Sequence, residues 1–127
     1  MIMNVDELNK ISERIINAAY KVSNTLGVGF LEKVYENALA HQLRKDGMGI
    51  EQQKSIKVYY DNVVVGDYFA DLIVEGSVIV ELKTAKRIED IHLAQTLNYL
   101  KATGLKLGLI INFGKPRVEI KRVVNKL

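Results

Sequence analysis

The stretch Phe69-Ala70-Asp71-Leu72-Ile73-Val74-Glu75-Gly76-Ser77-Val78-Ile79-Val80-Glu81-Leu82-Lys83 decides the fold. Two runs rich in β-branched residues flank a short polar segment, which predicts a β-hairpin. The second run alternates, so that Ile79, Glu81 and Lys83 would share one face of a strand. Charged side chains are seldom buried unless they are paired or bind a metal. This face therefore indicates either a metal site or a solvated hairpin surface.

The length of the hairpin turn decides whether Asp71 joins Glu81. A two-residue turn would place Asp71 opposite Val80, with the two acids on opposite faces. A three-residue loop at residues 75–77, or a bulge on either strand, would place Asp71 directly opposite Glu81. Adjacent carboxylates repel each other, whereas a hard cation such as Mg²⁺ between them is attracted by both.

Length and composition describe an ordinary globular protein. The 127 residues fit a single domain spanning residues 1–127, with 48% hydrophobic and 26% charged residues. The absence of cysteine excludes disulfides and thiolate metal sites, and it suits a cytoplasmic protein. Neither a signal-peptide apolar region nor a run of ~20 apolar residues is present, so we expect no membrane partner.

Basic residues gather near the end of the chain. The net charge is +3, but residues 115–127 carry five basic residues against one acidic residue. A basic edge beside a carboxylate cluster would suit a polyanionic substrate. A solvated strand explains the same composition equally well.

The periodicity of the sequence predicts an α/β fold with a mixed sheet. The expected helices cover residues 6–26, 30–45 and 88–102. The expected strands cover residues 55–60, 63–65 and 68–74, 78–84, 105–113 and 118–124, with a bulge or bend at Gly66 between the two parts of the second strand. The nearly all-apolar run at residues 105–113 indicates a central strand, and residues 118–124 indicate an edge strand.

The third predicted helix combines an apolar stripe with three polar candidates. Its expected buried residues are Ile88, Ile91, Ala94, Leu97 and Leu100. His92, Gln95 and Tyr99 follow one another at helical spacing on one side. Taken alone, they are typical of a solvated helix face with one half-buried aromatic residue.

Glu32 lies in the first turn of the second predicted helix. A carboxylate is stabilised there by the helix dipole, and that explanation needs no active site. We nevertheless predict that its carboxylate points toward Asp71 and Glu81, because the turn at Gly27-Val28-Gly29 can place the start of this helix over the sheet.

Several short motifs together resemble a known family. In order, they are Gly29-x-x-Glu32-x-x-Tyr35, Asp71, Glu81-Leu82-Lys83 and Gln95-x-x-x-Tyr99. This set is similar to that of the GxxExxY family of the PD-(D/E)xK nuclease-like superfamily, over about residues 8–124. The resemblance implies a restriction-endonuclease-like core, which is a mixed β-sheet with an antiparallel meander flanked by helices. One departure is that Ala70, and not proline, precedes Asp71.

The resemblance also implies roles for individual residues. The metal ligands would be Asp71, Glu81 and the carbonyl of Leu82. The catalytic residues would be Lys83, Glu32 and Gln95. Further residues that line the site would be Tyr35, His92 and Tyr99. The implied cofactor is Mg²⁺ or Mn²⁺, and the implied partner is nucleic acid, either DNA or RNA.

Physical chemistry supports this interpretation, because phosphodiester hydrolysis requires an activated water and compensation of the charge on the phosphate. We therefore predict a metal-dependent nuclease. One alternative is a non-catalytic module on the same fold that binds nucleic acid or protein. Another is a phosphodiesterase acting on a small nucleotide, which would need a closed pocket in place of an open groove.

Overall fold

The structure is a computed structural model that describes residues 3–127. Within this range, two helices, three strands, a helix and two strands follow one another, which is the predicted order. Their bounds are α1 Val5–Leu26, α2 Glu32–Lys45, β1 Ile50–Tyr60, β2 Val63–Val74, β3 Val78–Lys83, α3 Asp90–Thr103, β4 Leu107–Asn112 and β5 Glu119–Val124. The expected α/β fold is thereby confirmed.

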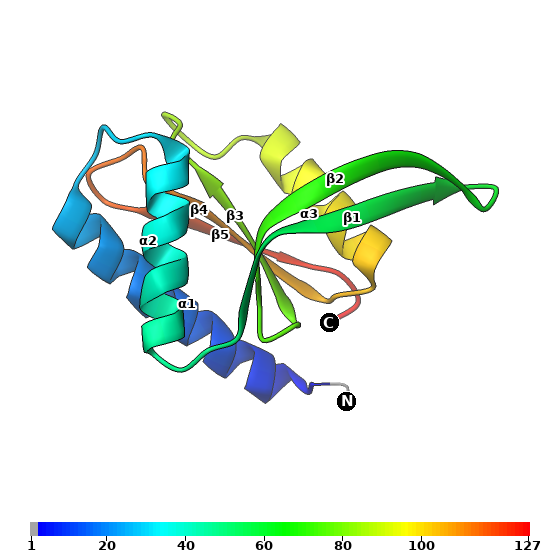
Figure 1. The fold of residues 1–127 in the computed structure, drawn as a ribbon, viewed down its shortest axis with the longest axis horizontal. Coiled ribbons are helices and arrows are strands. Elements are labelled where there is room, and N and C mark those ends of the chain that lie inside the picture. The colour runs from blue at the N-terminus through cyan, green and yellow to red at the C-terminus, as the bar shows by residue number, and fades with distance from the viewer. Residues whose placement is uncertain (1–2) are drawn as a thin grey trace.

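The strands form one mixed sheet in the order β1-β2-β3-β4-β5. The first three strands pair antiparallel, as the predicted meander requires. β3 and β4 are parallel, and α3 makes the connection between them (Figure 1). β5 pairs antiparallel with β4 and forms one edge of the sheet. This arrangement is consistent with a restriction-endonuclease-like fold.

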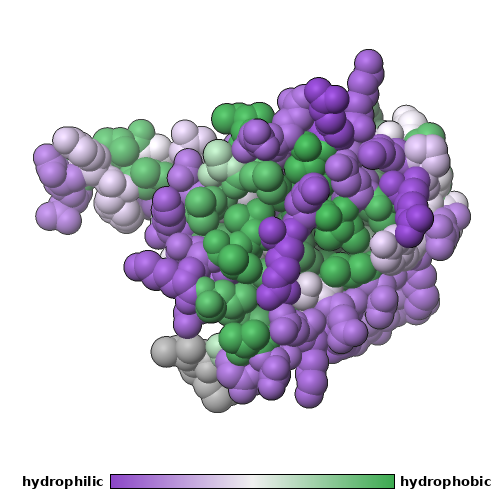
Figure 2. Space-filling model, turned by 180° about the vertical axis from the view of Figure 1, so that it is seen from behind, coloured by the Kyte–Doolittle hydropathy of each residue, from purple (hydrophilic) through white to green (hydrophobic). Residues whose placement is uncertain are grey.

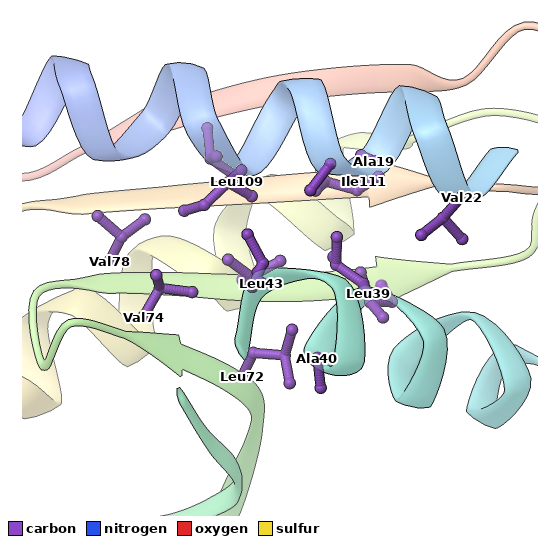
Figure 3. Close-up of a cluster of buried hydrophobic side chains, with 14 of the residues drawn as sticks. Ala19, Val22, Leu39, Ala40, Leu43, Leu72, Val74, Val78, Leu109 and Ile111 are labelled. Carbon is purple, nitrogen blue, oxygen red and sulfur yellow. The ribbon is translucent and has the colours of Figure 1, made fainter. Parts of the chain in front are cut away.

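Helices cover both faces of the sheet, and each face has its own hydrophobic core. α1 and α2 pack on one face, where Leu39 and Leu43 of α2 lie over the aliphatic side chains of β2, β3 and β4 (Figure 3). α3 packs on the other face, against Ile79 and Ile110. Burying an aliphatic side chain contributes ~1.5–3 kcal/mol, so these two cores hold the sheet between the helices. Every residue of β4 is buried, as expected of a central strand.

The side of α3 that faces the sheet differs from the predicted stripe. Ile91 is 68% exposed and Ala94 is exposed as well, whereas Thr96, Tyr99 and Leu100 are buried. The prediction was wrong at Ile91 and Ala94 because helical spacing identifies a set of neighbours but not which neighbours meet the sheet.

A glycine in β4 allows α3 to approach the sheet. A Cβ atom built at Gly108 would lie 2.8 Å from Cγ2 of Thr96, a separation that real Cβ atoms essentially never show. The close approach of α3 to the sheet therefore depends on Gly108.

The hairpin of β1 and β2 extends beyond the rest of the sheet as an arm (Figure 1). The bulge expected near Gly66 is present, because Val58 pairs with Gly66 while Tyr59 pairs with Val64. Val65 is thus the extra residue on β2, and such a bulge increases the local twist of the strands. The arm consequently bends relative to the sheet that carries it.

Apolar side chains are also present on the surface. Figure 2 shows them gathered in the middle of the face seen from behind, with the arm projecting to one side. On the arm itself, Tyr59, Tyr60, Val63 and Val65 are all more than half exposed. Among residues 3–127, no helix is both long enough and apolar enough to span a bilayer.

Candidate active site

The turn between β2 and β3 brings two carboxylates together. Val74 pairs with Val78, so residues 75–77 form a three-residue loop. Extending this register toward the other end of the hairpin places Asp71 opposite Glu81. The register predicted for a shared site is therefore present.

Side chains replace the backbone pairing where the two acids meet. The Asp71 amide donates to Oε2 of Glu81 at 3.2 Å, and the Leu82 amide donates to Oδ2 of Asp71 at 2.9 Å. Each carboxylate thus accepts a hydrogen bond from the backbone of the opposite strand, which satisfies donors that would otherwise be unpaired. These bonds fix the two acids side by side.

Gln53 of β1 connects this pair to α2. Its φ angle is 50°, a left-handed conformation that is uncommon for a non-glycine residue. From this position its side-chain amide donates to Oδ1 of Asp71 at 3.1 Å and to Oε1 of Glu36 at 2.8 Å. Strained residues of this kind cost ~1–3 kcal/mol and cluster at functional sites. Sequence analysis missed Gln53, because nothing in a strand sequence marks a left-handed glutamine.

Glu36 is a second residue that sequence analysis did not assign to the site. It is only 3% exposed and accepts hydrogen bonds from Lys33, Gln52 and Gln53. It follows Glu32 by one helical turn, and this i, i+4 spacing was the available signal. The hydrogen bonds from Gln52 and Gln53 to Glu36 connect β1 to α2 and hold the Gln53 side chain in place.

Glu32 begins α2 near the end of β3 (Figure 1). Although the residue is exposed overall, burial of its carboxyl group and the charge of Asp71 raise the pKa of Glu32, while Lys83 acts in the opposite direction. These effects place Glu32 within electrostatic reach of Asp71 and Lys83. The direction of its side chain toward Asp71 and Glu81 stays a prediction.

Glu81 has the most strongly perturbed environment of the site. The residue is 6% exposed, and its burial, together with the charge of Asp71, raises the pKa of Glu81 to about 9. Without a cation, Glu81 therefore keeps its proton at neutral pH. Perturbed carboxyl groups of this kind are typical of functional sites.

Lys83 is the last residue of β3 and is half-buried. Its charge opposes the rise in pKa of both Glu32 and Glu81, so its ammonium group lies near both acids. Leu82 is fully buried, and it is its amide that bonds to Asp71. The role expected for the Leu82 carbonyl stays a prediction.

Gln95 and Tyr99 approach the pair from α3. Nε2 of Gln95 donates to the Tyr99 hydroxyl at 3.0 Å. Burial, and then the charge of Glu81, raise the pKa of Tyr99, which places its hydroxyl near that acid. The Tyr99 ring also packs against Tyr68 of the arm, with the centroids 5.8 Å apart.

Tyr35 and His92 have structural roles. Tyr35 is fully buried, and its ring stacks on that of Phe113 with the centroids 4.8 Å apart. Its hydroxyl donates a hydrogen bond to the Gly27 carbonyl at 2.6 Å. His92 accepts a hydrogen bond from the Glu89 amide through Nδ1 at 3.0 Å and so caps the start of α3. These bonds assign Tyr35 to the core and His92 to the helix cap.

The acidic pair fits a hard cation by the chemistry of its donors. Among residues 3–127, no three His, Cys, Asp or Glu side chains are grouped closely enough to hold a metal ion. Mg²⁺, however, usually binds through one or two carboxylates and completes its shell with water and substrate phosphate. Asp71 and Glu81 meet this requirement, and Glu32 supplies a further carboxylate nearby.

Part of the basic end of the chain lies on β5, two strands from β3. β4 separates β5 from β3, which amounts to about 10 Å at the usual strand spacing of ~4.8 Å. Lys121 and Arg122 of β5 are exposed. Lys121 pairs with Ile110, which in turn pairs with Glu81, so Lys121 lies two strands from this acid on the same face of the sheet. A basic border of the site therefore stays a prediction.

Comparison with protein families gives one match. A family model described as the PD-(D/E)XK nuclease superfamily matches residues 9–123. Comparisons with curated proteins and with solved structures give no significant match.

Proposed function

Because the chain belongs to the PD-(D/E)XK nuclease superfamily, we propose that it is a metal-dependent nuclease that hydrolyses phosphodiester bonds in DNA or RNA. The observation that carries the proposal is the placement of Asp71 and Glu81, which are hydrogen-bonded across β2 and β3 with Lys83 beside them. Within the superfamily, we propose that the chain is a member of the GxxExxY family, on the basis of the motif around Glu32 and Tyr35.

Asp71 and Glu81 would hold Mg²⁺ or Mn²⁺, with the Leu82 carbonyl as a further ligand. When bound, such a cation supplies an activated water and compensates charge on the phosphate. Lys83 would stabilise the negative charge that develops on the phosphate, which is where a fixed cation is most effective. Glu32, at the start of α2, would reach toward the cation with a further carboxylate.

A cleavage assay tests the proposal. Labelled DNA and RNA, each single- and double-stranded, are incubated with Mg²⁺ or Mn²⁺ and, as a control, with a chelator. We expect metal-dependent cleavage that falls by ~10²–10³ in Lys83→Ala, the usual loss when one charge-stabilising group is removed. Lys10→Ala, which removes an exposed lysine of α1, is the matched control and should cleave like the wild type.

Substrate binding separates catalysis from folding in the same variant. Nucleic-acid affinity is shared among many basic side chains, so Lys83→Ala should bind nearly as tightly as the wild type. Equal cleavage by Lys83→Ala and the wild type would remove Lys83 from the mechanism.

A non-catalytic binding module is the second candidate. It rests on the same fold, because a fold does not by itself determine an activity. Titration calorimetry with Mg²⁺ and Mn²⁺ discriminates between the candidates, because a binding module has no need of a cation at Asp71 and Glu81. Absence of both metal binding and cleavage would favour the module.

A further inference from the structure

A groove lies between the arm and α3. Its volume is about 730 Å³, within the range of ~300–1,000 Å³ typical of pockets for small ligands. Ile91 and Ala94, the two residues that we wrongly expected in the core, line it from α3. These two exposed side chains thus form an apolar wall of the groove, facing the arm.

Aromatic rings form the wall on the side of the arm. Tyr59 is 61% exposed and Tyr68 is 48% exposed. The Tyr68 ring is held on two sides, because it packs at 45° against Tyr99 and lies over Gly66, where a Cβ atom would come within 3.0 Å of the ring. Exposed aromatic rings are the platforms on which unpaired nucleic-acid bases stack.

Polar groups follow the groove along α3. Gln95, Asn98 and Lys101 are spaced three residues apart and therefore lie on one side of the helix. The two amides can donate to and accept from the edges of a base. Lys101 on α3, and Lys57 on the arm, add positive charge for phosphates, although Lys57 also pairs with Asp67 at 3.5 Å.

The groove is continuous with the candidate active site. Gln95 and Tyr99 line it and are hydrogen-bonded to each other. Tyr99 is also the residue whose hydroxyl is influenced by Glu81. A strand bound in the groove would consequently contact Gln95 and Tyr99, which the groove shares with the candidate active site.

We propose that this groove binds an unpaired base of a single-stranded nucleic acid, so that the substrates of the nuclease are single strands. In a duplex the base faces are covered by their neighbours and only the edges are accessible, which leaves nothing to stack on the tyrosines. The substrate assignment rests on the proposed function, whereas the binding assignment is independent of it.

Binding measured without metal tests the proposal. Fluorescence anisotropy follows a labelled single strand and the same sequence as a blunt duplex, in a chelator so that no cleavage occurs. We expect the wild type to bind the single strand more tightly than the duplex. Tyr59→Ala should weaken single-strand binding about tenfold, the usual range for loss of one stacked base being about 5- to 150-fold.

Control variants separate stacking from folding. Tyr59→Phe keeps the ring and should bind like the wild type. Tyr20→Ala removes another exposed tyrosine, on α1, and should have no effect. Asn98→Ala removes a polar group from the opposite wall, at an exposed helix position where alanine does not disturb folding, and should also weaken binding.

Several results would overturn the proposal. These are equal affinity for single strand and duplex, no nucleic-acid binding, or Tyr59→Ala behaving like Tyr20→Ala. If a free mononucleotide competes for the groove as well as the single strand does, the groove is a site for a small nucleotide and the single-strand proposal is wrong. Single-strand binding without any cleavage would instead refute the nuclease and leave the groove assignment intact.

Discussion

At the residue scale, Glu81 makes the stability of the metal-free protein depend on pH in an unusual direction. Its carboxyl group has a pKa of about 9 when folded and an ordinary value of 4.5 when unfolded. Between these values the unfolded chain ionises Glu81 while the folded chain does not, so rising pH favours unfolding. The stabilising contribution is complete below pH ~4.5 and is lost progressively up to pH ~9.

Glu81→Gln keeps a neutral group of the same shape and should remove this pH dependence. We therefore expect that, in a chelator, the melting temperature of the wild type falls relative to that of Glu81→Gln as the pH rises from 6 to 8.5. Thermal unfolding followed by circular dichroism measures the difference at each pH. Parallel curves for the two proteins would contradict the protonated state of Glu81.

Gln53 allows strain to be separated from hydrogen bonding. Gln53→Ala loses the bridge to Asp71 and Glu36 but keeps a left-handed residue, which costs about 1–2 kcal/mol for any side chain with a Cβ. Gln53→Gly loses the same bridge without that strain. Urea unfolding should therefore find Gln53→Gly more stable by about 1 kcal/mol, while both variants lose nuclease activity. Equal stability of the two would argue against strain at this position.

At the scale of elements, a buried asparagine holds the segment that follows Lys83. Asn112 of β4 is fully buried; it accepts from the amides of Ala85 and Gly114 and donates to the Ala85 carbonyl and to Glu119. Asn112→Ala would leave these groups without their partner, and one such loss already costs ~1–3 kcal/mol. We expect a loss of about 2–4 kcal/mol in urea unfolding. Asn17→Ala, at an exposed position of α1, is the control and should be neutral.

The elements also show how far the sequence predicts this structure. Helix and strand order, the position of the bulge and the central place of β4 follow from local pattern, because each depends on neighbouring residues. Which side of α3 packs on the sheet does not follow from local pattern, because it depends on the close contact between Gly108 and Thr96. The placement of Asp71 opposite Glu81 was one of two registers that the sequence allowed, and the left-handed Gln53 depends on partners in α2 that no local pattern reveals.

At the scale of the whole molecule, the site lies where three layers meet. α2 and its core cover one face of the sheet, α3 and its core cover the other, and the acidic pair lies between them at the end of β3. Folding is therefore driven by apolar burial, and a bound cation should add to stability without being required for it.

Mg²⁺ should accordingly raise the melting temperature only modestly. A ligand that binds the folded state alone contributes about 1.4 kcal/mol at ten times its dissociation constant, which corresponds to roughly 3–6 °C for a chain of this size. A chelator should reverse the shift without unfolding the protein. Asp71→Asn removes one ligand charge and should abolish the shift, whereas Asp6→Asn, at an exposed position of α1, should retain it. A shift of equal size in Asp71→Asn would mean that the cation binds elsewhere, because the effect depends on the carboxylates that β2 and β3 place side by side.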